Sequence, residues 1–306
     1  MKKYLYLCFA LAIGIELVAQ QASRLTQSAD DFGLDNPAGL SFEEMRYRGT
    51  VLSGLIRNQW WIGDAVGYPR TQALSWLDTR PEHYQYGAAI LADKVGETRS
   101  FGLMARYAHT LAEGLKIGLS ASGNSQRIAV ERLDQYDVAD PLAAAAGDTR
   151  WRLAVSAGVF YHIYQRNRAW NWFAGLAVRH GFALRHFTEN AEAPAETDLL
   201  AQGGIGRGAF WAGGRLRMSL HLPGALDVYA RQYFSDERFF LGGIFTTDSE
   251  HQTAGVQAGM ERLLSSRGDK GNHFLTLSFS FARPLSHYVE GGSLIFDGRI
   301  TWSWEQ

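Results

Sequence analysis

Cysteine, proline and net charge are all scarce in this sequence of 306 residues. The single cysteine is Cys8, close to the amino terminus. The rest of the chain therefore cannot form disulfides, bind metal through cysteine or use a cysteine in catalysis. There are only 7 prolines, and 30 Lys and Arg balance 31 Asp and Glu to a formal net charge of -1. Binding to the phosphate backbone of a nucleic acid needs an excess of positive charge, which this chain lacks. A nucleic-acid partner is therefore excluded.

Long apolar runs are missing as well. Beyond the amino-terminal segment, the longest stretch without Asp, Glu, Lys or Arg is 153–165. This stretch is shorter than the ~18 residues that indicate a membrane-spanning helix. The sequence therefore predicts no transmembrane helix.

The amino terminus has the layout of a secretory signal peptide. Lys2 and Lys3 precede a mostly apolar run, and Ala19 precedes a polar stretch. We predict a signal peptide at 1–19, an N-terminal periplasmic segment at 20–48 and a β domain at 49–306. An uncleaved membrane anchor is the alternative, but the run is shorter than the ~20 residues of a span and Glu16 interrupts it.

The dominant pattern beyond the signal has a period of two. In the segment 272–284, Leu277 and Phe279 alternate with Ser278 and Ser280, and similar alternation recurs along the chain. Successive side chains of a strand point to opposite faces, so each segment predicts a strand with one apolar and one polar face. The predicted strands are 49–62, 71–79, 83–93, 98–111, 115–131, 150–165, 168–185, 207–219, 224–235, 238–248, 252–264, 272–284 and 293–304.

These segments favour a transmembrane antiparallel β-barrel of the outer membrane. Tight connections alternate with long polar ones at 132–149 and 186–206, and a membrane strand needs only ~9–11 residues. The thirteen segments are an odd number, whereas bacterial barrels close with an even number. We therefore expect fourteen strands, with one missed or merged, and twelve as the alternative.

The position of the charges distinguishes a membrane barrel from a secreted β-sandwich, which is the competing fold. The polar face carries arginines in the middle of strands, among Gly and Ser, whereas the opposite face is Leu, Val, Phe and Trp. Aromatic residues gather at strand ends, as membrane interfaces require. The arginines that we expect in the lumen are Arg57, Arg106, Arg152, Arg215, Arg217, Arg231 and Arg299.

No motif indicates catalysis or a cofactor. The nine histidines include no pair at metal-ligand spacing within one element. Asp134, Asp137 and Asp140 lack the alternating spacing and central glycine of a calcium loop, so a solvated loop is favoured. Gly-x-Ser-x-Gly, phosphate-binding loops and His-Glu-x-x-His are absent. No pair of Glu residues at strand ends stands out for glycoside hydrolysis. We predict a non-enzyme without metal or cofactor.

Four local patterns follow one another along the chain. They are Asn36-Pro37-Ala38-Gly39; Arg57-Asn58-Gln59-Trp60 with Gly67-Tyr68-Pro69-Arg70-Thr71; Asp93-Lys94-Val95-Gly96 with Tyr107-Ala108 and Leu115–Gly118 after it; and Asp137-Val138-Ala139-Asp140-Pro141. In this order the patterns resemble the PorP/SprF family of outer-membrane proteins of type IX secretion and gliding, and the resemblance is carried mainly by residues 20 to about 180. The candidate residues are Asn36, Pro37, Arg57, Gln59, Trp60, Pro69, Asp93, Gly96, Asp140 and Pro141. Each pattern also has an architectural interpretation as a turn or a wall residue.

The resemblance implies a structural and partner-binding role. Proteins of this family hold secreted surface proteins or adhesins with a C-terminal sorting domain at the outer membrane of Gram-negative cells, in contact with type IX secretion components. The alternative is a diffusion pore for small solutes, since a barrel of about fourteen strands can enclose water. The residues that contact a partner are not predicted by the sequence.

Overall fold

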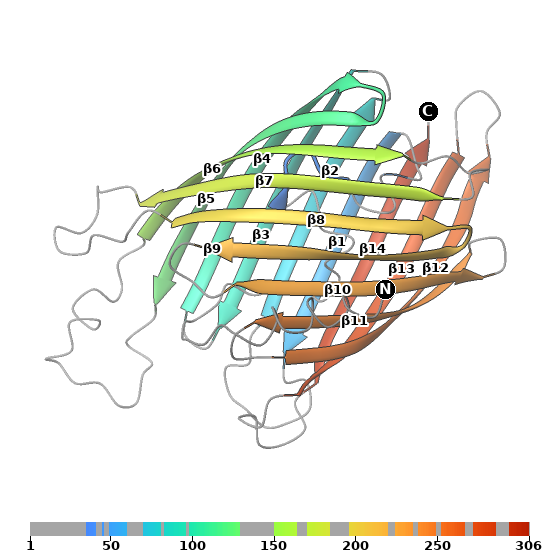
Figure 1. Ribbon diagram of the computed structural model, residues 1–306. Helices are drawn as coiled ribbons and strands as arrows, with labels where there is room; N and C mark the ends of the chain where they lie inside the picture. The colour runs from blue at the N-terminus through green and yellow to red at the C-terminus, as the bar shows by residue number, and fades with distance from the viewer. Residues whose placement is uncertain are drawn as a thin grey trace, which may run out of the picture.

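Fourteen antiparallel strands close into one β-barrel in the computed structural model of the protein (Figure 1). The structure describes residues 35–40, 45, 49–59, 70–80, 83–95, 98–128, 150–163, 170–183, 196–219, 224–234, 238–248, 252–266, 272–285 and 294–305. The strands follow chain order around the barrel, and β1 pairs with β14 to close it.

The strand bounds match most of the segments expected from the alternating pattern. The strands are β1 Gly49–Gln59, β2 Arg70–Arg80, β3 Tyr84–Val95, β4 Thr98–Ala112, β5 Leu115–Ile128, β6 Arg150–Ile163, β7 Asn171–Ala183, β8 Glu196–Arg207, β9 Phe210–Ser219, β10 Ala225–Phe234, β11 Phe239–Asp248, β12 Gln252–Ser266, β13 Asn272–Pro284 and β14 Ile295–Glu305. The fold class and the expected count of fourteen strands are confirmed.

The strand that the sequence pattern missed is β8. The sequence predicted a long loop at 186–206, and this prediction was wrong over its second half. Residues Glu196–Arg207 form a strand that pairs with β7 on one side and β9 on the other. Leu199 and Leu200 are adjacent, and glycines occupy both faces of the strand. This arrangement hides the period of two, so the acidic start of the strand suggested a loop.

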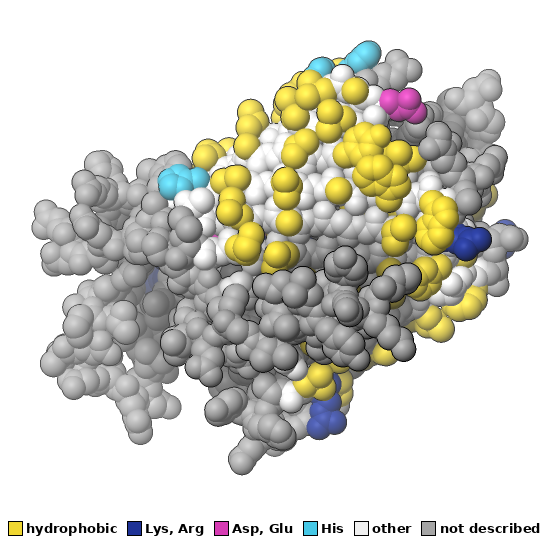
Figure 2. All heavy atoms as spheres, in the orientation of Figure 1, with side chains coloured by type: hydrophobic (Ala, Val, Ile, Leu, Met, Phe, Trp, Pro, Cys, Tyr) yellow, Lys and Arg dark blue, Asp and Glu magenta, His cyan; other side chains and the backbone are white. Residues whose placement is uncertain are grey.

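Apolar side chains cover the outer face of the barrel, and polar ones line much of its interior. In β13 the side chain of Phe279 is 47% exposed, whereas that of Ser278 is only 3% exposed. Figure 2 shows apolar side chains spread over the outer face of the strands that it presents. This inverted arrangement is that of a barrel whose outer face meets hydrocarbon. None of the described residues forms a helix long and apolar enough to span a membrane.

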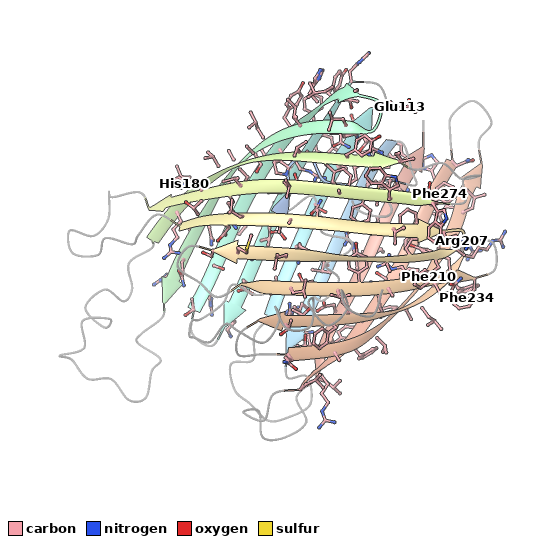
Figure 3. All side chains as sticks on the ribbon, in the orientation of Figure 1. Glu113, His180, Arg207, Phe210, Phe234 and Phe274 are labelled. Atoms are coloured by element: carbon pink, nitrogen blue, oxygen red, sulfur yellow. The ribbon has the colours of Figure 1, made fainter. Side chains whose placement is uncertain are left out.

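The two ends of the barrel differ in how they connect the strands. One end, called here the turn end, carries the tight turns at 113–114 and 208–209, with Gly114 at φ 75. The loop end carries the connections 129–149 and 184–195. Figure 3 labels Glu113, Arg207 and Phe234 at the turn end and His180 at the loop end. Since Gly49 pairs with Glu305, the first and last strands begin and finish at the turn end.

An aromatic layer fills the lumen near the turn end. The rings of Phe160 and Phe173 stack with centroids 5.8 Å apart, and those of Tyr233 and Phe240 lie 5.4 Å apart. All four side chains are buried, together with Trp211. Apolar residues of the N-terminal segment join this cluster, namely Ala38, Leu40 and Met45. The barrel therefore has a packed core inside its lumen as well as an apolar outer face.

Candidate functional site

Residues 35–40 form a short turn that lies inside the barrel, against the inner faces of β4 to β9. In Figure 1 this segment is the blue piece of chain inside the ring of strands. Asn36, Ala38 and Leu40 are each at most 2% exposed. The interval 20–48 was predicted as a periplasmic segment, and those boundaries stay a prediction, but its described residues 35–40 pack on the inner wall.

Asn36 shapes this turn and fastens it to the wall. Its side-chain oxygen accepts a hydrogen bond from the backbone nitrogen of Ala38 at 3.0 Å, and its backbone oxygen accepts one from Gly39 at 2.8 Å. Its side-chain nitrogen donates to the backbone oxygens of Val159 at 3.2 Å and Leu176 at 3.5 Å. An Asn whose side chain accepts a hydrogen bond from the backbone two residues ahead, and which is followed by Pro, is typical of a turn.

Three glycines hollow the wall where the turn sits. Gly118 of β5 lies opposite Gly158 of β6, and Gly175 follows on β7. A Cβ added at Gly118 would lie 2.6 Å from the backbone nitrogen of Ala38, and one at Gly175 would lie 2.8 Å from the Asn36 side-chain nitrogen. Any larger side chain at these positions would occupy the space of the turn. We call this surface the glycine hollow.

Two arginines of β9 hold the start of the segment by its carboxylate. Arg217 Nη2 lies 2.7 Å from Asp35 Oδ1, and Arg215 Nη1 bonds Asp35 Oδ2. Arg215 is also bonded through Nε and Nη2 to Asp227 of β10, at 3.0 and 2.7 Å. At the other end of the segment, Arg106 Nη1 donates to the Gly39 carbonyl at 3.2 Å. The segment is thus held by charge at one end and by a carbonyl contact at the other.

Arg57 and Asp93 belong to a second luminal group on the other side of the barrel. Arg57 is 4% exposed, and its Nε lies 3.8 Å from Asp297 Oδ1. Thr71 stands between Arg57 and Asp93 in the strand register and donates to Asp93 Oδ1 at 2.6 Å. The structure therefore separates the predicted residues into two groups, with Asn36 and Pro37 at the glycine hollow and Arg57 and Asp93 beside the β1–β14 pair.

The structure describes the remaining predicted residues only in part or not at all. Gln59 is the last residue of β1, and only its backbone is described. The others lie outside the described residues: Trp60, Pro69, Gly96, Asp140 and Pro141.

Sequence reasoning missed Gln202 and the joint role of Arg215 and Arg217. Arg215 and Arg217 were expected in the lumen, and their spacing of two residues on one strand was the available signal that they act on a common partner. Asp35, which contacts both of them, precedes Arg215 by 180 residues and Arg217 by 182 residues in the chain. Gln202 was missed because β8, the strand that carries it, was not predicted.

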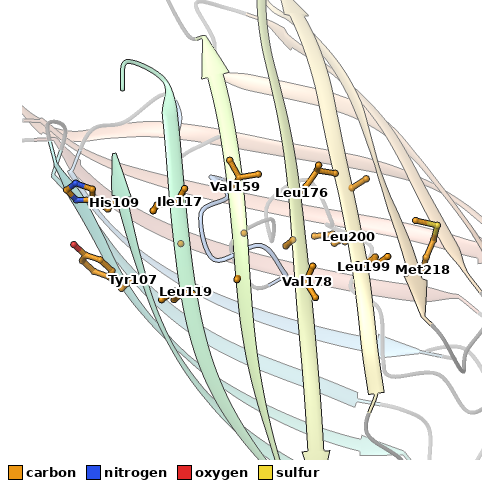
Figure 4. Close-up of a pocket in the computed structure, with 15 residues that line it drawn as sticks. Tyr107, His109, Ile117, Leu119, Val159, Leu176, Val178, Leu199, Leu200 and Met218 are labelled. Atoms are coloured by element: carbon orange, nitrogen blue, oxygen red, sulfur yellow. The ribbon is translucent and has the colours of Figure 1, made fainter. Parts of the chain in front are cut away.

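On the outside of the same wall there is an apolar hollow of about 720 Å³ (Figure 4). Outward-facing residues such as Leu119, Val159, Leu176 and Leu199 line it, and Gly118 and Gly158 form part of its floor. The glycines that receive the turn on the inside therefore also thin the wall on the outside.

The described residues contain no group of three or more His, Cys, Asp or Glu placed to hold a metal ion. The hydrogen-bonding groups around the glycine hollow are the guanidinium groups of Arg106, Arg215 and Arg217, backbone carbonyls and the side-chain amide of Gln202. Such groups bind peptide and carboxylate oxygens and peptide N–H groups. The arrangement suits binding of a polypeptide segment.

Known proteins resemble the chain in family and in fold. The family model described as "Type IX secretion system membrane protein PorP/SprF" matches residues 34–293. The solved structure of the CymD monoaromatic hydrocarbon channel is 13% identical, with a TM-score of 0.54 over 94% of this chain and 95% of that chain. A TodX deltaS2S3 mutant, also a monoaromatic hydrocarbon channel, is 9% identical, with a TM-score of 0.52 over 89% of this chain and 94% of that chain. No curated protein matches the sequence.

Proposed function

Since this chain belongs to the PorP/SprF family of type IX secretion system membrane proteins, we propose that it holds a secreted partner at the outer membrane. The partner is a surface protein or adhesin with a C-terminal sorting domain, and other type IX secretion components contact the barrel. Outer-membrane lipid surrounds the apolar outer face. The protein acts without catalysis, since its family and fold are those of a secretion-system membrane barrel rather than of an enzyme class.

The observation that carries this proposal is the packing inside the barrel near the turn end. The segment 35–40 and the aromatic layer around Phe160 and Phe173 occupy the inside of the barrel near the turn end. A diffusion pore needs a continuous water-filled path, whereas a protein that holds a partner benefits from a rigid, packed interior. The packing near the turn end therefore supports holding over diffusion.

The orientation follows from the connections. After removal of the predicted signal peptide 1–19, the chain enters the barrel from the periplasm, and the turn end, where β1 begins and β14 finishes, faces the periplasm. The loop end then faces the outside of a Gram-negative cell, as in other outer-membrane barrels. The long connection after Ile128 is consequently presented to a surface partner.

The proposal is tested by partner capture from native membranes. Detergent-solubilised wild type should retain a large surface protein or secretion component in stoichiometric amount. A variant with the connection 129–149 shortened should lose it while its barrel still assembles, because strand pairing does not require the connection. A variant shortened at 286–293, at the same end, is the matched control. The absence of any partner, together with ohmic channels in planar bilayers, would favour the pore.

A further inference from the structure

We propose that the glycine hollow is a peptide-binding site that also accepts a segment of another protein. Its occupant in this structure is the chain's own segment 35–39. The ligand class is a short turn that carries a carboxylate followed by a side-chain amide, as Asp35 and Asn36 do. Identifying the incoming segment as part of the held partner rests on the proposed function, but the existence of the site does not.

The barrel strands maintain the geometry of the site when the segment is absent. Asp227 lies directly opposite Arg215 in the strand register and bonds it through two nitrogens, so Arg215 stays oriented when Asp35 leaves. The glycine hollow is set by the backbone of β5, β6 and β7, which the strand ladder fixes. A preorganised site loses little free energy in ordering itself around a ligand.

The segment can leave without breaking the barrel. Among the described residues it forms no backbone-to-backbone hydrogen bond with a strand, and its own backbone bond joins Gly39 to Asn36. Its polar attachments are side-chain contacts through Asp35, Asn36 and Arg106, and Ala38 and Leu40 add apolar contacts within the buried cluster. Exchange of such contacts for those of an equivalent segment leaves every strand pair intact.

Gln202 provides hydrogen-bonding capacity that the segment 35–39 leaves unused. It is 6% exposed, and neither its Nε2 nor its Oε1 has a hydrogen-bond partner among the described residues. A Cβ at Gly175 would lie 3.1 Å from Gln202 Nε2 and 2.8 Å from Asn36 Nδ2, so both amides approach the same point of the wall. A buried amide without partners is unfavourable. A longer or more polar segment would satisfy it.

The test uses a fluorescent, end-capped peptide with the sequence of residues 33–40 and the full-length protein in detergent. In one variant residues 35–39 are replaced by Gly-Ser-Gly-Ser-Gly, which keeps the chain length and empties the site of its charged occupant. We expect saturable binding to this variant by anisotropy. Wild type should bind at least about tenfold more weakly, because the tethered segment competes at an effective concentration in the millimolar range.

Two changes probe the chemistry of the site. Adding Arg217→Gln to the replaced variant, or Asp35→Ala to the peptide, should each weaken binding by about tenfold, since each removes one charge-assisted contact. Arg217 is chosen because Arg215 also supports the wall through Asp227. Different migration before and after boiling on gels verifies that each variant is folded.

The proposal is overturned if the folded replaced variant shows no saturable binding, or if the Asp35→Ala peptide binds it equally well. Because the assay contains no partner protein, its outcome is separate from that of the capture experiment. Peptide binding without partner capture would support the site and count against the holding function. Partner capture without peptide binding would support the holding function and count against the site.

Discussion

The wall formed by β13, β14 and β1 differs from the wall formed by β5, β6 and β7 in what covers its inner face. The first, called here the seam wall, joins several of its buried polar side chains by hydrogen bonds between neighbouring strands. Arg299 Nε donates to Ser53 Oγ at 2.7 Å, and Ser53 Oγ lies 3.1 Å from Thr301 Oγ1. The second wall presents glycines, and a separate segment of the chain fills the space in front of them.

This difference shows two ways of closing a lumen. In the seam wall, side chains of the strands themselves fill the adjacent part of the lumen. Strand pairing fixes their positions. The glycine wall depends on a segment that reaches it from outside the barrel sheet, so closure there is a docking event. Substitutions in the seam wall should therefore weaken the barrel itself, whereas substitutions in the glycine hollow should release the segment and spare the barrel.

The largest effect is expected from Asp297→Ala in the seam wall. This change leaves the buried Arg57 guanidinium without its neighbouring carboxylate, and breaking a buried ion pair destabilises by roughly 3–5 kcal/mol. Unfolding in urea, followed by tryptophan fluorescence of the protein in lipid vesicles, measures the loss. Ser303→Ala on the same strand is the control. Equal losses for the two variants would show that the pair does not stabilise this wall.

Phe279→Arg tests the outer face of the same wall. Phe279 points outward in the middle of β13, and a lipid-facing arginine near the bilayer midplane costs roughly 2–4 kcal/mol. Assembly into vesicles should fall sharply, as judged by the fraction of protein that resists unfolding in sample buffer before boiling. Phe279→Leu should assemble normally. Equal assembly of both variants would place this face away from lipid.

Gly118→Ala should displace the segment while the barrel remains closed. The added Cβ meets the backbone of Pro37 and Ala38 rather than a movable side-chain end, and overpacking of this kind costs about 1–3 kcal/mol. The reporter is Ala38→Cys in a Cys8→Ala background, which makes it the single cysteine. Maleimide labelling should be slow without Gly118→Ala and fast with it.

Gly123→Ala is the matched control for that change. It lies on the same strand, and its added Cβ would come no closer than 3.4 Å to Leu153 Cδ2. Labelling should stay slow in this variant. Fast labelling of the Ala38→Cys reporter in the absence of Gly118→Ala would instead mean that the segment does not rest in the glycine hollow in solution.

The smallest effect is expected from Ser53→Ala. Its hydroxyl bonds both Arg299 and Thr301, and the net contribution of one buried hydrogen bond is about 1 kcal/mol. Urea unfolding should shift by that amount, whereas Ser120→Ala on the inner face of β5 should change stability less. A larger loss for Ser120→Ala would reverse the assignment of the polar network to the seam wall.

Much of the barrel was predictable because its strands obey a local rule. The alternation of Leu277 and Phe279 with Ser278 reports which face meets hydrocarbon, and this information lies within one strand. The luminal positions of Arg57 and Arg231 followed from the same period, and both side chains are buried. The family resemblance, seen in the turn and strand motifs, was confirmed by the match over residues 34–293.

The site was predictable only in part, because its contacts join distant parts of the chain. Asn36 was recognised as part of a turn, but nothing near it in sequence indicates that Val159 and Leu176 accept its hydrogen bonds. Gln202 was hidden because β8 mixes glycines and adjacent leucines on its two faces. Patterns of this kind lose the signal of period two on which strand prediction depends.

The sequence by itself determined the closed antiparallel sheet, its inside-out polarity and the expected even strand number, since these follow from local alternation and from the requirement that every strand edge in a membrane be paired. Only the tertiary structure decided that residues 35–40 enter the lumen and that Asp35 lies between Arg215 and Arg217. That pairing depends on barrel closure, which brings β9 and the N-terminal segment together. No local pattern records such proximity, because the contact energy arises between groups 180 residues apart.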